Sequence, residues 1–517
     1  MIQLTRSEDQ AALRALNLAI MAFATQWTEG SHRKRQRYST LNETLKNTPE
    51  DFADEITRAF DRDLRQNFWQ QAQRGLEDVA HLESYRVVCA EMIFGLTQKP
   101  WESDDCSARI AVEAIASEND GTRVGQASML SQLRHIMSKE GPPIYLERAV
   151  RKVQALKFRY DSLVRGVARP AKGDRKTGGP NALQTMTVED RSTVGLWYWL
   201  AVMTDTLSSS MYERPVVLPD EDCENDADQE NLQLNAATDP DESPASRRWR
   251  IDRFTKDSLD QPCQLVHWPC SYEAAADVVT KSAPVKVLLF RYVSYLQNTL
   301  RKGGCRESVE KLIRNATSIY RYWNITYGAF FRELVQHYDK VPQRIQGWFF
   351  CISAHWHLAA IMLTDLIEYI DENDLGETSD ARSRISSKMV SRIREASARE
   401  LSDLARVATP PDEEAGHLAA PQQPDFHHAV NEGTFLTEPW TMILIKAFTK
   451  ASLMLLGEAD DFLRYGQIKL GHDTQVIKES LERGEECISV LWYLGKKSDM
   501  AREVAEILSS TLGKLSI

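Results

Sequence analysis

The sequence predicts an all-α protein, a large multi-helix domain of packed antiparallel helices, on two observations. First, apolar residues recur at steps of three and four in segments 13–27, 194–211 and 345–363, which places them along one face of a helix. Second, alternating β-branched runs joined by tight turns are almost absent, and Asp120-Gly121 lacks the alternating flanks of a hairpin. Segments that break the helical pattern are predicted to be disordered insertions.

The first predicted helix carries its apolar face at Leu13, Leu16, Ile20, Phe23 and Trp27. Steps of three and four bring all five onto one side, so this helix is expected to be amphipathic.

The second predicted helix starts at a capping pair, Thr187 and Asp190. Its face is predicted to run through Val194, Trp197, Ala201, Thr204, Ser208 and Met211. Trp197 is therefore expected to be buried, and Trp199, roughly opposite on the helix, to face solvent.

The third predicted helix lies in one of the two longest apolar stretches of the chain and covers roughly 345–370. Its face is predicted to comprise Ile345, Trp348, Phe349, Ile352, Trp356, Ala359 and Leu363. A helix of this kind is expected to lie in a core.

Three segments interrupt the helical pattern. Residues 165–183 combine two Pro, four Gly and five Lys or Arg, and residues 219–246 hold ten Asp or Glu without a Lys or Arg. A third segment is rich in Pro. The predicted division is a helical half at 1–218 with a basic linker at 165–183, an acidic insertion at 219–264, a second helical half at 265–405, a Pro-rich loop at 406–434 and C-terminal helices on the same core at 435–517.

Composition narrows the classes of protein further. The chain has 517 residues, 42% of them hydrophobic and 26% charged, which excludes a globally disordered or collagen-like chain. The formal net charge of −11 argues against a broad grip on nucleic acid, because phosphate binding depends on clustered Lys and Arg.

The cysteines and the apolar segments predict a soluble protein of a reducing compartment. Eight cysteines are scattered without paired short spacings, unlike a secreted disulfide framework. The N-terminus lacks the pattern of a secretory signal. The apolar stretches at 345–370 and 439–456 contain His and Lys residues, so no membrane span is expected.

No catalytic, cofactor-binding or metal-binding residue is predicted. His355 and His357 are two apart, about 200° round a helix, so both cannot reach one ion. A magnesium motif of isoprenoid synthases fails at Asp460-Asp461, because Arg464 stands where a third carboxylate is needed. The enzyme interpretation is therefore only a distant alternative.

Two charged segments each have a regulatory interpretation and a purely structural one. The basic run at 33–37 has the composition of a nuclear-import signal, and the acidic segment 219–246 that of a recruiting segment. A solvated loop and a disordered surface insertion are the respective alternatives.

The segment 191–223 resembles the signature of the fungal-specific transcription factor regulatory domain, the middle homology region of fungal binuclear zinc-cluster factors. That family has an Arg-initiated, Trp-rich helix with an Asp, then a turn and an acidic element. The matching residues here are Arg191, Trp197, Trp199, Asp205, Arg214, Pro215, Asp220, Glu221 and Asp222. Glu213 stands where the family often has Gly. We expect Pro215 to stop the helix and Arg214 to hold the acidic turn.

The resemblance extends over roughly residues 60–370. Segment 68–101 resembles the first helical hairpin of that domain, and 348–370 its late helix, with a histidine on the core face. The six-cysteine zinc cluster is not found, so zinc is expected only in a separate N-terminal module and DNA binding only through it. The chain is either the regulatory part of a larger activator or a protein that has lost its DNA-binding module.

The resemblance implies a non-enzymatic, effector-sensing and autoinhibitory regulatory domain that controls metabolic genes in the nucleus, with shuttling from the cytoplasm. The expected partners are a small-molecule inducer and a coactivator, a corepressor or a second copy. Candidates for the effector pocket are Trp197, Trp348, Phe349 and His355. The alternative is a helical protein-interaction scaffold or corepressor without DNA binding.

Overall fold

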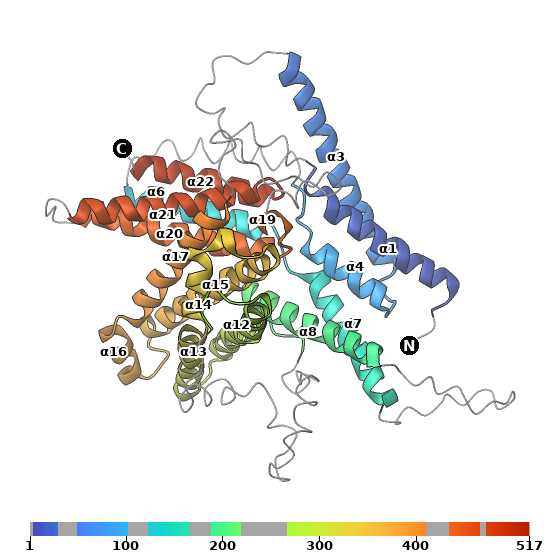
Figure 1. Ribbon diagram of the computed structural model, residues 1–517, viewed down its shortest axis with the longest axis horizontal. Coiled ribbons are helices and arrows are strands. Elements are labelled where there is room, and N and C mark those ends of the chain that lie inside the picture. Colours follow the sequence, from blue (N-terminus) through green and yellow to red (C-terminus); the bar gives the residue numbers. More distant parts are fainter. Residues whose placement is uncertain are drawn as a thin grey trace, which may run out of the picture. The chain divides into compact units, whose positions relative to one another are not determined.

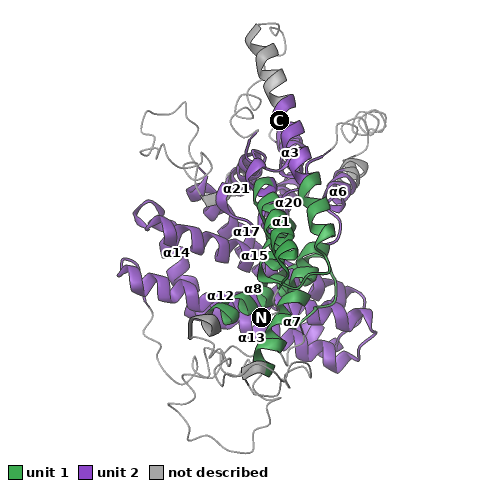
Figure 2. Cartoon of the chain, turned by 90° about the vertical axis from the view of Figure 1, so that its right-hand side faces the viewer, with its two compact units in different colours: residues 1–21, 70–95, 143–252 green, residues 22–69, 96–142, 253–517 purple. Residues whose placement is uncertain are grey.

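The computed structural model describes residues 4–28, 49–101, 122–164, 188–218, 266–409, 434–465 and 472–515. Every regular element within these residues is a helix, which confirms the all-α prediction. The predicted insertions at 165–183 and 219–264, and residues 410–433 of the predicted Pro-rich loop, lie outside the described residues. The chain divides into two compact units, shown in Figure 2.

Unit 1 comprises residues 1–21, 70–95 and 143–252. Its helices are the first part of α1 (Arg6–Thr25), the last part of α3 (Pro49–Asp78), most of α4 (Tyr85–Leu96), α7 (Ile144–Val164) and α8 (Val188–Met211). The core is formed by Val88, Met92, Ala149, Val150, Val153, Leu156, Tyr198, Ala201, Val202 and Leu218.

Helix α1 is present as predicted, but it buries a different face. Ala12, Ala15 and Ala19 are at most 1% exposed, whereas Leu13 and Ile20 are 43% and 45% exposed. The reason is a close approach of α3, where a Cβ on Gly75 would lie 3.8 Å from the Cα of Ala15. Small side chains permit this spacing, and the larger ones of the predicted face do not.

Helix α8 buries four of its six predicted face residues, Val194, Ala201, Thr204 and Ser208, but the buried side is wider than predicted. The buried stripe runs through Val194, Tyr198, Ala201 and Val202, while Trp197 and Trp199 are both half-buried and pack against the same core. Each tryptophan lies about 100° from Tyr198 on the helix, so the two flank the stripe. The prediction that Trp199 faces away from the core is therefore wrong.

Unit 2 comprises residues 22–69, 96–142 and 253–517. Its further elements are α6 (Thr122–Ser138), α12 (Tyr272–Arg301), α13 (Arg306–Thr326), α14 (Gly328–Gln336), the 3₁₀ turn η5 (Tyr338–Lys340), α15 (Gln343–Glu372), α16 (Thr378–Ser386), α17 (Met389–Ala408), α19 (Thr434–Thr437), α20 (Thr441–Tyr465), α21 (His472–Leu494) and α22 (Asp499–Leu515). Helices α12, α17 and α20 pack around α15, and α21 and α22 pack on α20 (Figure 1).

Helix α15 is the central element of unit 2. Trp356 is fully buried and stacks on Trp323 of α13 with 4.2 Å between ring centroids. The helix is long and apolar enough to cross a membrane, yet 78% of its most apolar window is buried inside the structure, as in a core helix. Because three helices cover it, its buried faces extend well beyond the predicted stripe.

Prolines set the boundaries of two helices in unit 2. Pro342 is the N-cap of α15, one residue before the helix begins. Helix α17 runs to Ala408, inside the predicted loop 406–434, and ends two residues before Pro410. A residue that precedes proline is disfavoured in the helical conformation, which explains the boundary.

Candidate functional site

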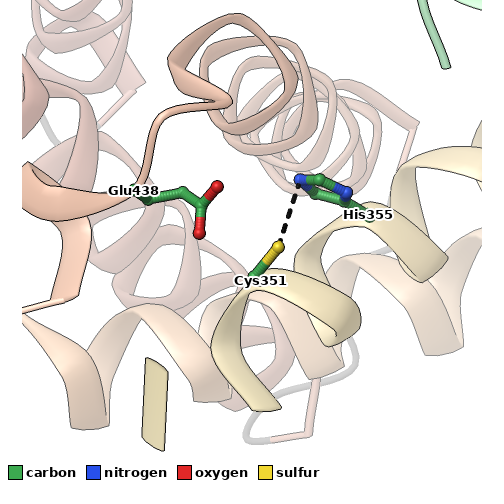
Figure 3. A group of neighbouring side chains, drawn as sticks. All are labelled: Cys351, His355 and Glu438. Carbon is green, nitrogen blue, oxygen red and sulfur yellow. Dashed lines mark hydrogen bonds between the residues drawn. The ribbon is translucent and has the colours of Figure 1, made fainter. Parts of the chain in front are cut away.

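A group of ionisable side chains lies in unit 2 where α15 meets the connection between α19 and α20. Cys351 and His355 are four residues apart on α15 and so project from the same face. Glu438 comes from the connection itself. One ligand atom from each of these three side chains lies within 4.8 Å of the other two (Figure 3). Together with Lys286 of α12, they are called the α15 cluster below.

The imidazole of His355 is held on both of its nitrogens. Nε2 lies 3.7 Å from Sγ of Cys351, and Nδ1 lies 3.3 Å from Nζ of Lys286. The indole of Trp440 meets the ring edge-on at a centroid distance of 6.1 Å. His355 has no exposed surface, so these neighbours fix the position of its ring.

Hydrogen bonds fix the segment that carries Glu438. The N–H of Trp440 donates to Oε1 of Glu438 over 3.1 Å. The ammonium group of Lys497 donates to the carbonyl oxygens of Leu436 and Glu438 over 2.9 and 2.7 Å. The indole N–H of Trp27 donates to the same Leu436 carbonyl over 3.0 Å. The carboxylate is therefore presented by a rigid backbone.

Burial shifts the proton affinity of every member of the α15 cluster. Desolvation raises the pKa of the Glu438 carboxyl and holds the pKa of the Cys351 thiol well above its usual range. The pKa of His355 lies well below its ordinary value because of desolvation and the nearby Lys286. Desolvation also lowers the pKa of Lys286. Burial thus favours the neutral form of each group.

The four residues predicted to line an effector pocket do not lie together in the structure. Trp348 is 38% exposed, and the guanidinium of Arg344 lies 4.8 Å from its ring centroid. Phe349 is fully buried and meets Phe331 edge-on at 5.4 Å. Only His355 belongs to the α15 cluster. Trp348 is at the surface because it lies one residue, or about 100°, round α15 from Phe349. Trp197 belongs to unit 1.

The segment that carries the sequence signature forms a helix end in unit 1. Glu213 adopts a left-handed conformation with φ of 53°, and the N–H of Arg214 donates to the Ser209 carbonyl over 2.9 Å, a Schellman-type ending. The buried carboxylate of Asp205 accepts hydrogen bonds from the N–H groups of Val217, over 2.9 and 3.0 Å, and Leu218, over 2.9 Å. Asp205 therefore holds the chain that leaves α8.

Arg214 has a different partner from the predicted acidic turn. Its guanidinium pairs with the carboxylate of Glu147 on α7 through two nitrogens, one of them over 3.0 Å. Glu147 is within reach of Arg214 because α7 and α8 pack together. Pro215 lies four residues after the end of α8, so the helix ends at the left-handed turn before it reaches the proline. Asp220, Glu221, Asp222 and the side chain of Arg191 lie outside the described residues.

The other candidate ligands found in the sequence are engaged separately. Nε2 of His357 lies 3.2 Å from Glu400 of α17, so His357 points away from the α15 cluster, as the geometry of an i, i+2 pair requires. Asp460 accepts a hydrogen bond from Arg464 over 2.6 Å. That pairing neutralises a carboxylate that a magnesium site would need.

Three members of the α15 cluster were not predicted from the sequence. The Cys351 and His355 spacing of four is a signal that could have been found, since helical ligand pairs sit at i and i+4. Lys286 and Glu438 gave no signal, because each lies more than 60 residues from His355 in sequence. No family model, curated protein or solved structure matches the chain.

Proposed function

We propose that the chain is the regulatory domain of a transcription factor and that the α15 cluster is where unit 2 responds to an effector. The observation that carries this proposal is the meeting of an amine, a thiol, an imidazole and a carboxyl group inside an all-α core. The function requires no catalysis by this chain.

The energetics of burial support a ligand-responsive role for the α15 cluster. A buried ionisable group costs several kcal/mol unless it is paired, and well-packed apolar residues of similar volume are often as stable or more stable. Lys286 and His355 are at most 2% exposed. Strongly perturbed ionisable groups that lie together are also typical of functional sites. Binding of an effector would supply the compensating contacts.

The assignment to transcription is supported by the signature segment. Trp197 packs against the core of unit 1 from the middle of α8, and at the end of this helix the Asp205 carboxylate holds the outgoing backbone. A domain of this kind would act in the nucleus, reach DNA through a separate zinc-cluster module and meet a coactivator, a corepressor or a second copy. A small-molecule inducer would release its inhibition.

The test is a reporter assay with the chain placed between a heterologous DNA-binding module and a strong activation domain. We expect the wild-type chain to repress the reporter relative to a fusion without it, and His355→Leu to change that repression. Cys487→Ala is the matched control, because Cys487 is fully buried in unit 2 but lies outside the α15 cluster. Reporter output that is the same for every fusion would overturn the proposal.

A second candidate function is a protein-interaction scaffold, which exposed apolar side chains in unit 1 favour. Phe158 of α7 and Leu196 of α8 are 73% and 68% exposed. Single exposed apolar residues are common, so the test must compare the two sites. The scaffold hypothesis predicts that Phe158→Ser combined with Leu196→Ser changes the reporter output, whereas His355→Leu leaves it unchanged.

A further inference from the structure

We propose that the α15 cluster is a metal site for a zinc-class divalent ion, with Sγ of Cys351, Nε2 of His355 and the carboxylate of Glu438 as ligands. The metal ion would be the ligand of the effector site. Only its regulatory role rests on the proposed function. Metal binding itself is argued from the geometry of the three side chains.

The spacing of the ligand atoms fits a tetrahedral ion. Zinc lies about 2.3 Å from thiolate sulfur and about 2.0 Å from imidazole nitrogen, so two such ligands of a tetrahedral ion are about 3.5 Å apart. Sγ of Cys351 and Nε2 of His355 are 3.7 Å apart. The ligand atoms of all three residues lie within 4.8 Å of one another, so an ion could be enclosed with small side-chain shifts.

The types of donor select the class of ion. A thiolate, an imidazole and a carboxylate are ligands of zinc and similar transition metals, whereas magnesium and calcium prefer oxygen ligands. Binding of the ion would release the protons of the thiol and the carboxyl group to solvent, and the resulting thiolate and carboxylate supply two negative charges, which balance a divalent ion. Three protein ligands leave the fourth position of a tetrahedron for water or for a donor group of a small molecule, as in open zinc sites.

The surroundings orient the ligands as metal sites require. Oε1 of Glu438 accepts the N–H of Trp440, which leaves Oε2 for an ion. Lys286 contacts Nδ1 of His355, so Nε2 is the nitrogen that faces Cys351. With Nε2 as the ligand atom, Nδ1 stays in contact with Nζ of Lys286 over 3.3 Å. A contact on the second ring nitrogen fixes the orientation of a ligating histidine ring.

The test is a titration of the purified, chelator-treated full chain with Co²⁺. We expect about one equivalent to bind with thiolate-to-cobalt charge-transfer absorption and the d–d bands of a tetrahedral site, and Zn²⁺ to remove both. Cys351→Ala should lose the charge-transfer band. Cys487→Ala should keep it, because Cys487 is a buried cysteine outside the α15 cluster.

A second variant covers the case in which Cys351→Ala does not fold, as judged by circular dichroism. Glu438→Gln keeps the shape of the side chain and should weaken Co²⁺ binding by at least about tenfold. Absence of the charge-transfer band in the wild-type chain, its persistence in folded Cys351→Ala, or unchanged affinity in Glu438→Gln would overturn the metal site.

The metal titration tests the metal site and the reporter assay tests the regulatory function, so one claim can be overturned without the other. Metal binding through Cys351 together with an unresponsive reporter overturns the regulatory function and supports the site. A reporter that responds to His355→Leu, in a chain that binds no Co²⁺, supports the function and overturns the metal as its effector.

Discussion

At the scale of single residues, Glu91 is a buried carboxylate with two cations on one oxygen. Lys152 and Arg148 contact its Oε1 over 2.6 and 2.9 Å, while Oε2 is buried and has no hydrogen-bond partner in the described part of the chain. Desolvation raises the pKa of Glu91 in spite of these cations. Lys152 is itself 8% exposed, so it depends on this carboxylate.

Removal of Glu91 should therefore destabilise the fold strongly. Glu91→Ala leaves a buried ammonium group without its partner, and we expect a loss of about 3–5 kcal/mol in the free energy of unfolding. Glu77→Ala is the control, because Glu77 pairs with the same Arg148 but is exposed, and it should cost at most about 1 kcal/mol. Urea unfolding of the two variants measures both costs, and equal losses would contradict the role given to burial.

The raised pKa of Glu91 also predicts a pH dependence with a definite sign. The folded state binds this proton more tightly than the unfolded state, so the contribution of Glu91 to stability is present at low pH and is lost as pH rises through its folded pKa. As the pH falls from 7 to about 5, the wild type should therefore gain stability relative to Glu91→Gln. Urea unfolding at both pH values tests this, and a gain in the opposite direction would show that the cations outweigh desolvation.

At the scale of elements, α8 shows how the burial of a helix is divided among neighbouring aromatic residues. Tyr198 is 5% exposed and lies on the axis of the buried stripe, while Trp197 and Trp199 flank it. Truncation of a fully buried aromatic side chain costs about 3–5 kcal/mol. We expect Tyr198→Ala to approach this range, and Trp197→Ala and Trp199→Ala to cost less and similar amounts.

Thermal unfolding of the three alanine variants gives the comparison. A large loss for Trp197→Ala with almost none for Trp199→Ala would instead restore the face predicted from the sequence. Asp205, one turn beyond Val202, is on the same buried side and holds Val217 and Leu218. The orientation of α8 thus also positions its C-terminal turn.

At the scale of the whole molecule, the formal charge of −11 is expected to weaken the binding of the chain to nucleic acids and other polyanions. Non-specific binding to duplex DNA comes from phosphate contacts by Lys and Arg and typically has a Kd of about 10⁻⁴–10⁻⁶ M at physiological salt. We expect this chain to bind at the weak end of that range, with an affinity that falls further as salt rises. Fluorescence anisotropy with labelled duplexes measures it, and nanomolar, sequence-selective binding would contradict the expectation.

The sequence by itself determined the helical class and the approximate bounds of α1, α8 and α15. These follow from local rules, because apolar periodicity and proline act within a few residues of the chain. His355 was also predicted to lie on the core face of its helix, and it is fully buried. A face predicted from apolar periodicity alone was less reliable, since Leu13 is exposed and Ala15 is buried.

Only the tertiary structure decided which neighbours meet. The face of α1 depends on the close approach of Gly75, and Arg214 chooses Glu147 because α7 packs on α8. The α15 cluster needs α12, α15 and the connection before α20 at one place, and no local pattern links Lys286 with Glu438. Burial, which sets the proton affinities of the α15 cluster, is a property of the packed helices and not of the sequence spacing.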